Sequence, residues 1–330
     1  MVNLNKNRIF SVLPAILALM IAVLISSNKY FVFLATLSTI NAIAILGIVI
    51  ISGLAGQLNL GQSAFVGLGA YTGAIMALRW GLPFWAAIPV TLFVAGLWGA
   101  LMGVPALRLK GGPYLALVTQ TFGEMVYLII MNIEKFTGGP FGLLGISYPK
   151  IFGYEIKGGV PYMYLSIFFL IVCYWICQKV SKSSVGLVLN GIRESEDAEQ
   201  SLGINTIRYK ITAFVLSAML GGISGLLYAP FVGYISPDQF RWNSSLLLVS
   251  GAIIGGMKSF GGAIVGAMVI TCLPEALRLS DQYRMILYGL LVIFCLALLP
   301  DGIASLYGKS LKEIGAMLRK RCRELARESK

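Results

Sequence analysis

Carboxylates are the reactive side chains that this sequence clusters most densely. Glu194, Glu196, Asp197 and Glu199 follow directly on Arg193 and hold four of the chain's 14 acidic residues. The chain has no histidine, so the usual general base near neutral pH is missing. Charges of both signs at this spacing can form ion pairs with a partner molecule, and they indicate a docking surface. A solvated loop is the open alternative, since mixed charges are common on any exposed helix.

Two other patterns could do chemistry, but neither fits its motif. Gly308-Lys309-Ser310 resembles the end of a phosphate-binding loop, whose backbone amides and lysine hold nucleotide phosphates. The earlier glycine of that motif should stand where the chain has Ile303, and no strand precedes the segment. The five cysteines lack a metal-binding motif. We therefore expect no nucleotide hydrolysis, no metal site and no bound cofactor in this chain.

A third candidate is a carboxylate inside an apolar run. Glu124 lies in the middle of such a run, in the segment Thr121-Phe-Gly-Glu-Met125. Ionisable groups at membrane depth are rare and usually functional. Glu124 could pair with a basic group such as Arg108 or line a path for a solute, and both interpretations stay open. No acid precedes it in the chain, which disfavours an ion-coupled carrier because the first spans hold no carboxylate relay.

The elements that must position these groups are membrane helices. The chain is 57% apolar and 12% charged, with a mean hydropathy of +0.82. Soluble domains carry about 25% charged residues. Apolar runs of about 18 or more residues can cross a bilayer as helices. We therefore predict an all-α, polytopic integral membrane helix bundle with about 9–10 spans. The expected spans are about 9–27, 30–52, 62–80, 84–104, 114–132, 162–179, 211–231, 244–256, 260–277 and 285–299.

The distribution of positive charge predicts the orientation of these spans. Most Lys and Arg residues fall on the segments that are inside when both termini are cytosolic. This topology accounts for the net charge of +12 without nucleic acid. Residues 1–27 are expected to be a retained first span, with a cleaved signal peptide as the alternative. Residues 1–300 would form the membrane domain, with a cytosolic loop at about 181–210, and residues 301–330 a basic cytosolic tail.

Glycine interrupts the hydrophobic rhythm twice, near residues 53–73 and 251–266. Glycine at membrane depth either lets helices touch closely or marks a re-entrant or broken helix. Polar neighbours favour a break in the first segment, because exposed amides cannot face lipid. We expect Gln57, Asn59, Gln62 and Ser63 to line a translocation path together with Glu124. The long outside connection, 133–161, could be a short interfacial loop or a contact for a binding protein.

The polar stretch between residues 179 and 210 suits a soluble motor that drives a permease from outside the bilayer. We predict one helix from about Ser184 to Leu202, with Gly203 as its left-handed C-cap.

Together these segments resemble LivM-type membrane permeases of branched-chain amino-acid ABC importers, and the resemblance covers nearly the whole chain. It includes Gly53-Leu-Ala-Gly-Gln-Leu-Asn-Leu-Gly-Gln-Ser-Ala-Phe-Val-Gly-Leu-Gly-Ala-Tyr71, Arg108-Leu-Lys-Gly-Gly-Pro-Tyr-Leu-Ala-Leu-Val-Thr119, Phe122-Gly-Glu124, Gly191-Ile-Arg-Glu-Ser-Glu196, Gly203-Ile-Asn205 and Arg208-Tyr-Lys210.

The family's ATPase-coupling motif is Glu-Ala-Ala followed after three residues by Gly, and this chain has Asp197-Ala198-Glu199-x-x-x-Gly203. Glu199 departs from the motif, and Asn59 stands where the family has Ser. The resemblance implies that the following residues couple the chain to ATPases: Gly186, Arg193, Glu194, Glu196, Asp197, Ala198, Glu199 and Gly203.

The resemblance also implies a complete assembly in the bacterial inner membrane. This chain would form half of the translocation path, with a second, LivH-type permease as the other half. Two cytosolic ATP-binding subunits would use ATP and Mg, and an extracytoplasmic solute-binding protein would deliver branched-chain amino acids for import by alternating access. The alternatives are the same machine for urea, a short amide or a sugar, and an ion-coupled secondary carrier.

Overall fold

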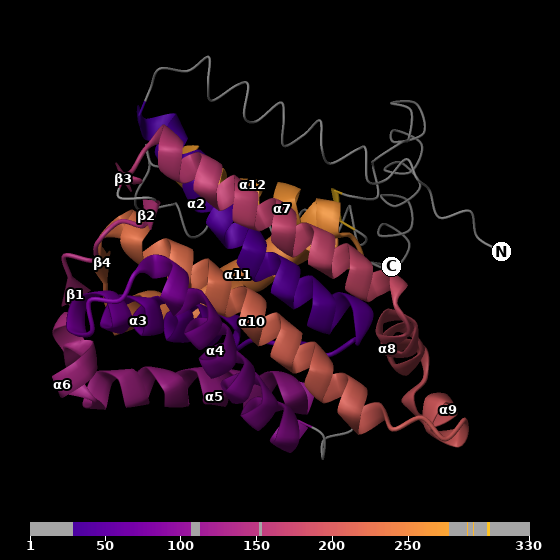
Figure 1. Ribbon diagram of the computed structural model, residues 1–330. Coiled ribbons are helices and arrows are strands. Elements are labelled where there is room, and N and C mark those ends of the chain that lie inside the picture. The colour runs from indigo at the N-terminus through magenta and orange to yellow at the C-terminus, as the bar shows by residue number, and fades with distance from the viewer. Residues whose placement is uncertain are drawn as a thin grey trace, which may run out of the picture.

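The protein is a bundle of long helices (Figure 1). The computed structural model describes residues 29–106, 113–151 and 154–276, together with residues 289, 293, 302 and 303. Its long helices are α2 (Lys29–Ile48), α3 (Gln62–Arg79), α4 (Phe84–Ala106), α5 (Pro113–Asn132), α7 (Val160–Lys182), α10 (Thr206–Val232), α11 (Trp242–Gly255) and α12 (Phe260–Ala276). The shorter elements are η1 (Val49–Leu54), α6 (Glu134–Thr137), η2 (Gly139–Phe141), α8 (Ser184–Glu194), α9 (Glu196–Ser201) and η3 (Pro237–Phe240). The short strands are β1 (Leu143–Leu144), β2 (Lys150–Ile151), β3 (Tyr154–Glu155) and β4 (Tyr234–Ile235).

The helices confirm the predicted all-α membrane bundle. Each expected span between residues 30 and 277 coincides with one of these helices, whereas spans 9–27 and 285–299 fall outside the described residues. Within the described part of the chain, five helices are long and apolar enough to cross a membrane. These are Lys29–Leu54, Phe84–Val104, Tyr114–Asn132, Val160–Lys182 and Thr206–Val232.

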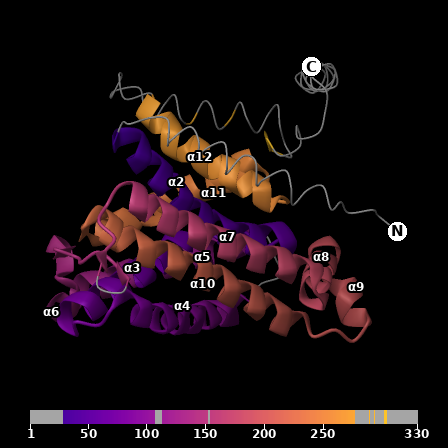
Figure 2. The same cartoon turned by 45° about the horizontal axis from the view of Figure 1, so that its top comes forward.

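Helix α10 lies at the centre of the bundle and packs against α2, α3 and α4. Figure 2 shows α12 and α4 on opposite sides of α10. Small residues allow the closest crossings, because a Cβ added to Gly69 would collide with the backbone of Gly222, and one added to Gly225 with the backbone of Val66. The second glycine-rich segment behaves in the same way, since Gly255 and Gly266 of α11 and α12 pack backbone to backbone. The predicted close packing is confirmed at these sites.

The first glycine-rich segment also contains the predicted break. The end of α2 widens into the π-helical segment η1, and the chain then turns at Gly56, which has a φ of +67°. Residues 57–59 form no regular element, and α3 begins only at Gln62. A helix followed by non-helical backbone at this depth is tolerated where it is buried in protein.

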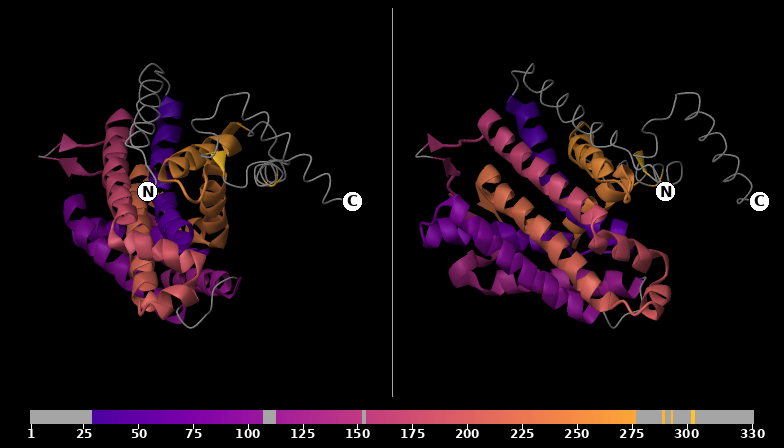
Figure 3. Two further views of the ribbon diagram at one scale, coloured as in Figure 1. Left: turned by 90° about the vertical axis from the view of Figure 1, so that its right-hand side faces the viewer. Right: turned by 45° about the vertical axis from the view of Figure 1, so that its right-hand side comes forward.

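The two ends of the bundle differ (Figure 3). One end carries α8 and α9 and is called the α8–α9 end below. The other carries two short antiparallel pairings, β1 with β4 and β2 with β3, and is called the hairpin end. Residues 133–161 are therefore partly folded at the hairpin end. Thr137 fixes α6 there by donating to the carbonyl oxygens of Ile130 and Ile133.

Candidate functional site

The break after α2 is held by one amide side chain. Gln62 Nε2 donates to the carbonyl oxygens of Ala44 and Ser217, both at 3.1 Å. Its Oε1 accepts from Asn59 Nδ2 at 3.0 Å and from Ser217 Oγ at 3.0 Å. Gln62 and Asn59 are fully buried. The first residue of α3 is thereby tied to the C-terminal part of α2 and to the middle of α10.

The N-terminus of α3 meets the N-terminus of α11 inside the bundle. Ser63 N donates to Ser245 Oγ at 2.9 Å, and the two hydroxyl oxygens lie 2.6 Å apart. Ser63 Oγ also donates to the carbonyl oxygen of Phe240, at 2.9 Å. From this junction α3 runs to the hairpin end, where Arg79 donates to the carbonyl oxygen of Lys135. Both helices therefore begin part-way along the bundle, although the first residues of α11 are exposed.

Four of the predicted path residues lie in the break or at the start of α3. Gln57, Asn59, Gln62 and Ser63 are all buried, and Ser52 Oγ donates to the carbonyl oxygen of Gln57 at 2.9 Å. The observed bonds give them a role in holding the break, and contact with a solute stays a prediction for them.

Glu124 pairs with Arg241, and the expected partner Arg108 lies outside the described residues. Glu124 Oε2 is 3.7 Å from Arg241 Nη2, and its Oε1 is buried without a hydrogen-bond partner in the described part of the chain. The Arg241 guanidinium lies over the ring of Tyr127, 4.9 Å from its centre, and Tyr127 donates to Asp238 Oδ1 at 3.1 Å. Sequence reasoning missed Arg241 and Asp238 because they follow α10, far along the chain from α5.

This charged cluster is on the surface of the chain, midway along α5. The side chains of Arg241 and Glu124 are 44% and 30% exposed. Leu117, Thr121 and Leu128 are exposed on the same helix. Trp242 and Asn243 are exposed at the start of α11. Charged groups at membrane depth rarely face lipid, so this surface is suited to a partner chain or a polar path.

The polar stretch at the α8–α9 end forms two helices, and the prediction of one continuous helix is wrong. Ser195 is extended, with φ −158° and ψ 105°, and it separates α8 from α9. Its Oγ accepts from Ala198 N at 3.3 Å and so caps α9. Serine before a run of acidic residues is a helix-start signal, and it was available in the sequence.

Helix α9 ends as predicted, at a left-handed Gly203 with a φ of +79°. The Gly203 amide donates to Gln200 O at 2.9 Å, and the Ile204 amide donates to Glu199 O at 3.2 Å. This pair of bonds is a Schellman motif, and it satisfies the last carbonyl groups of the helix.

Two acids of the cluster point back to the chain instead of outward. Glu196 Oε1 lies 2.5 Å from Nζ of Lys210, whose side chain is only 2% exposed. Glu199 lies so close to Gly191 of α8 that an added Cβ there would collide with its carboxylate. Glu196 and Glu199 thus fix α9 to its neighbours, while Glu194, Asp197 and Ala198 are exposed.

Arg193 links α8 to the break. Its Nη1 donates to the carbonyl oxygen of Gly53 at 2.7 Å, and its aliphatic stem packs on Gly56, where a Cβ would collide with it. Gly186, like Gly56, allows a close contact, because a Cβ there would collide with the backbone at the end of α7. Arg193 thus connects α8 directly to the segment that precedes α3.

Apolar side chains that the charge pattern did not reveal are also exposed at the α8–α9 end. Leu187 is 69% exposed, Leu202 is 76% exposed, and Ile207 is also exposed. Exposed leucines beside acids and capped helix ends are typical of a protein–protein contact. Periodicity places Leu187 on a helix but cannot tell which face is uncovered.

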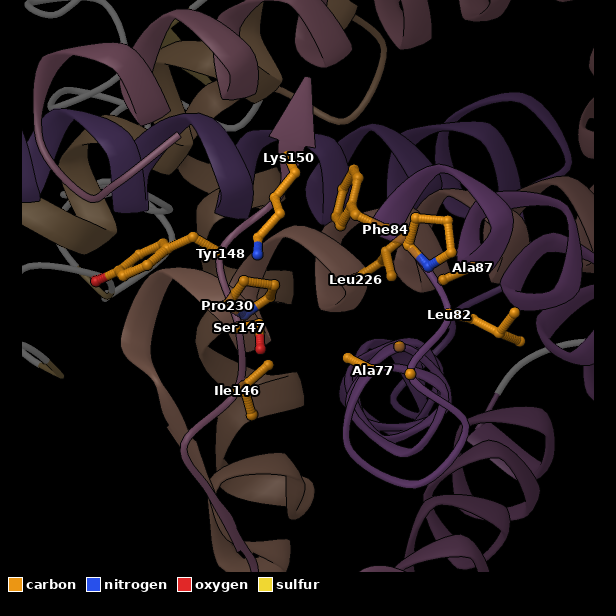
Figure 4. Close-up of a pocket in the computed structure, with 13 residues that line it drawn as sticks. Ala77, Leu82, Phe84, Ala87, Ile146, Ser147, Tyr148, Lys150, Leu226 and Pro230 are labelled. Carbon is orange, nitrogen blue, oxygen red and sulfur yellow. The ribbon is translucent and has the colours of Figure 1, made fainter. Parts of the chain in front are cut away.

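The hairpin end contains a cavity of about 290 Å³. Phe84, Leu226 and Pro230 line it, and Lys150 points into it beside Ser147 (Figure 4). Lys150 also pairs with Glu155 at 3.1 Å. The cavity is otherwise apolar, so it lacks the converging polar groups of a specific ligand site.

Comparisons with known proteins agree with this architecture. The family model described as "Branched-chain amino acid transport system / permease component" matches residues 30–296. The high-affinity branched-chain amino acid transport system permease protein LivM of Escherichia coli is 33% identical, over 93% of this chain and 77% of that protein. The ribose import permease protein RbsC of Haemophilus influenzae is 26% identical over 80% and 82% of the two chains. The permease LivH of Salmonella typhimurium, from a high-affinity branched-chain amino acid transport system, is 23% identical over 81% and 92%. No solved structure matches the chain.

Proposed function

This chain belongs to the family of permease components of branched-chain amino acid transport systems, and we propose that it forms half of the path of an ATP-driven importer for leucine, isoleucine, valine or a related amino acid. The observation that carries the proposal is the match of the family model to residues 30–296, which include every described helix of the bundle from α3 to α12. The permease is a multi-pass membrane protein.

The second half of the path would come from another permease. LivM and LivH are both named as permeases of high-affinity branched-chain amino acid transport systems, which supports a two-permease assembly. The exposed, charged surface of α5 and the start of α11 suits this contact, because charged groups at membrane depth are tolerated where they are covered or solvated.

The α8–α9 end would receive the partner ATPases, which use ATP and Mg. Leu187 and Leu202 would enter an apolar groove of the ATPase, and Glu194 and Asp197 would meet basic groups around it. Asp197 and Ala198 are the members of the family motif whose side chains are exposed, so they would form part of the docking surface. The docking end would face the cytosol in the bacterial inner membrane.

The opposite, hairpin end would receive the solute-binding protein. Phe141, Leu144 and Tyr154 are exposed there, on the short elements between α6 and α7. Exposed aromatic and aliphatic side chains on ordered loops are suited to a transient protein contact.

The solute is the point to test first. Ribose is the best-supported alternative, because the permease RbsC is similar over 80% of the chain. The chain should be reconstituted with its partner permease, ATPases and binding protein, and uptake of labelled leucine and ribose compared. We expect leucine uptake that excess unlabelled valine suppresses. Ribose uptake without leucine uptake would refute the amino-acid proposal.

A further inference from the structure

The pair formed by Glu124 and Arg241 is more open than a structural ion pair. Its shortest distance, 3.7 Å between Oε2 and Nη2, exceeds the length of a charge-assisted hydrogen bond. The second carboxylate oxygen of Glu124 has no hydrogen-bond partner within the described residues, although the atom is buried. Both side chains therefore keep capacity to bind a further charged group.

An apolar hollow of about 400 Å³ lies between α4 and α5, and its lining includes Thr121, one helical turn before Glu124. Thr121 and Met125 belong to its lining, and they are three residues before and one residue after Glu124 on the same helix. Trp98, Leu101 and Val118 provide much of the remaining surface. The exposed side chains of α5, such as Leu117, Thr121 and Leu128, thus have charged groups on the side toward α11 and an apolar surface on the side toward α4.

These two flanks match the chemistry of one class of solute. An amino acid with a branched aliphatic side chain carries a carboxylate, an ammonium group and an apolar group on one carbon atom. Arg241 can bind the carboxylate, since its guanidinium offers several donors. Glu124 can accept from the ammonium group, with Asp238 as a second acceptor nearby, and the hollow can take the aliphatic group.

We propose that Glu124, Arg241 and the hollow between α4 and α5 form a contact site that a zwitterionic aliphatic amino acid occupies in transit. The inference rests on the proposed function and adds the residues that bind the carboxylate and the ammonium group of the solute. The Arg241 and Glu124 side chains are 44% and 30% exposed in this chain, so they would bind a solute weakly, which a path requires because a solute that binds tightly cannot leave.

The charges are tested by single and paired substitutions in the complete assembly in proteoliposomes. We expect Glu124→Gln and Arg241→Gln each to lower leucine uptake about tenfold, while ATP hydrolysis stimulated by the loaded binding protein stays near the wild-type rate. The exchange Glu124→Arg with Arg241→Glu should not restore uptake. The control is Lys179→Gln, at an exposed lysine of α7 that belongs to neither proposed contact surface, and it should leave uptake unchanged.

Three outcomes would overturn the inference. Normal leucine uptake in both single variants would show that the charges do not meet the solute. Full recovery in the exchange variant would show a structural ion pair. Parallel loss of uptake and of ATP hydrolysis would show a contact that holds the permeases together.

The hollow is tested by filling it from either wall. We expect Val118→Phe and Leu101→Phe to lower the ratio of leucine to valine uptake several-fold, because leucine needs room for one more methylene group. An unchanged ratio in both variants would overturn this part of the site. Uptake by the wild-type assembly distinguishes a wrong contact site from a wrong function. Transport of ribose without leucine contradicts the proposed function itself, whatever the variants do.

Discussion

At the scale of single residues, the interior of the bundle depends on one amide group. Gln62 makes all four of its side-chain hydrogen bonds inside the chain, to Ala44, Asn59 and Ser217. An amide in this environment cannot exchange its partners for water. Gln62 therefore fixes the point at which α3 begins, and with it the position of Ser63 against Ser245.

Replacing Gln62 by leucine should destabilise the permease. The change removes three bonds to α2 and α10. Bonds between membrane helices contribute about 0.6 kcal/mol each, so we expect a loss of about 2 kcal/mol. The loss should appear as a lower midpoint of thermal unfolding in detergent. Gln178→Leu is the matched control, because Gln178 makes one bond, to Tyr174 of its own helix. Equal midpoints for the two variants would contradict this account.

At the scale of elements, the sequence predicts the membrane-spanning helices well and the interruptions between helices less well. Apolar runs predict helices because a buried backbone must satisfy its own hydrogen bonds. The interruption at Ser195 was predictable in principle, from a serine before acidic residues. The partner of Glu124 was not, because Arg241 approaches α5 only after α10 and η3 have folded. Whether Glu196 points inward to Lys210 or outward is likewise decided by tertiary packing.

The end of α9 gives a prediction at this scale. Gly203 and Gly81 both have positive φ, +79° and +60°, and neither has an atom that an added Cβ would meet. Valine should cost about 1–2 kcal/mol of local strain at either position. Only Gly203→Val should lower leucine uptake per ATP hydrolysed, because only that turn holds the docking helix.

Both glycine variants should insert and accumulate normally, as judged by membrane abundance. A similar loss of coupling in Gly81→Val would mean that strain at any turn is enough, and the role of the α9 end would be refuted.

The link from α8 to the break gives a second prediction. Arg193→Met keeps most of the side chain's length but removes the bond to the carbonyl oxygen of Gly53. We expect ATP hydrolysis to continue while leucine uptake falls several-fold, since motion of α8 no longer reaches the start of α3. Arg208→Met, at an exposed arginine in the first turn of α10, is the control. Undiminished uptake in Arg193→Met would refute the link.

At the scale of the whole molecule, one arrangement occurs twice in opposite directions. Helix α2 runs to the α8–α9 end, where the helical structure is interrupted. Helix α3 then starts inside the bundle and runs to the hairpin end. Helix α10 runs to the hairpin end, the chain returns through η3, and α11 starts part-way along the bundle and runs back (Figure 1). The two helix starts meet at Ser63 and Ser245. Repeats of opposite direction that meet near the midplane are typical of transporters.

This arrangement separates the three proposed contact regions along the bundle. The proposed docking surface is at the α8–α9 end, the pair formed by Glu124 and Arg241 is near the middle, and the exposed apolar loops are at the hairpin end. In the proposed coupling, a movement of α8 would reach the break through the bond from Arg193 to Gly53, without passing through the hairpin end.

The docking surface itself gives a prediction for the assembly. Leu187→Ala with Leu202→Ala should weaken binding of the ATPases at least about tenfold, because a few buried apolar anchors supply most of the energy of such contacts. Co-purification and light scattering measure the effect. Phe93→Ala with Phe168→Ala, two exposed positions on α4 and α7, is the control and should leave the assembly intact. An equal effect of both double variants would contradict the assignment of the docking surface.

Import driven by ATP is tested most directly by leucine uptake into proteoliposomes that contain the complete assembly, with ATP and Mg enclosed or omitted. We expect uptake that requires the ATPases, ATP and the binding protein, and that is lost in the double variant Leu187→Ala with Leu202→Ala. Uptake by this chain alone, driven by an ion gradient and independent of ATP, would contradict import driven by ATP.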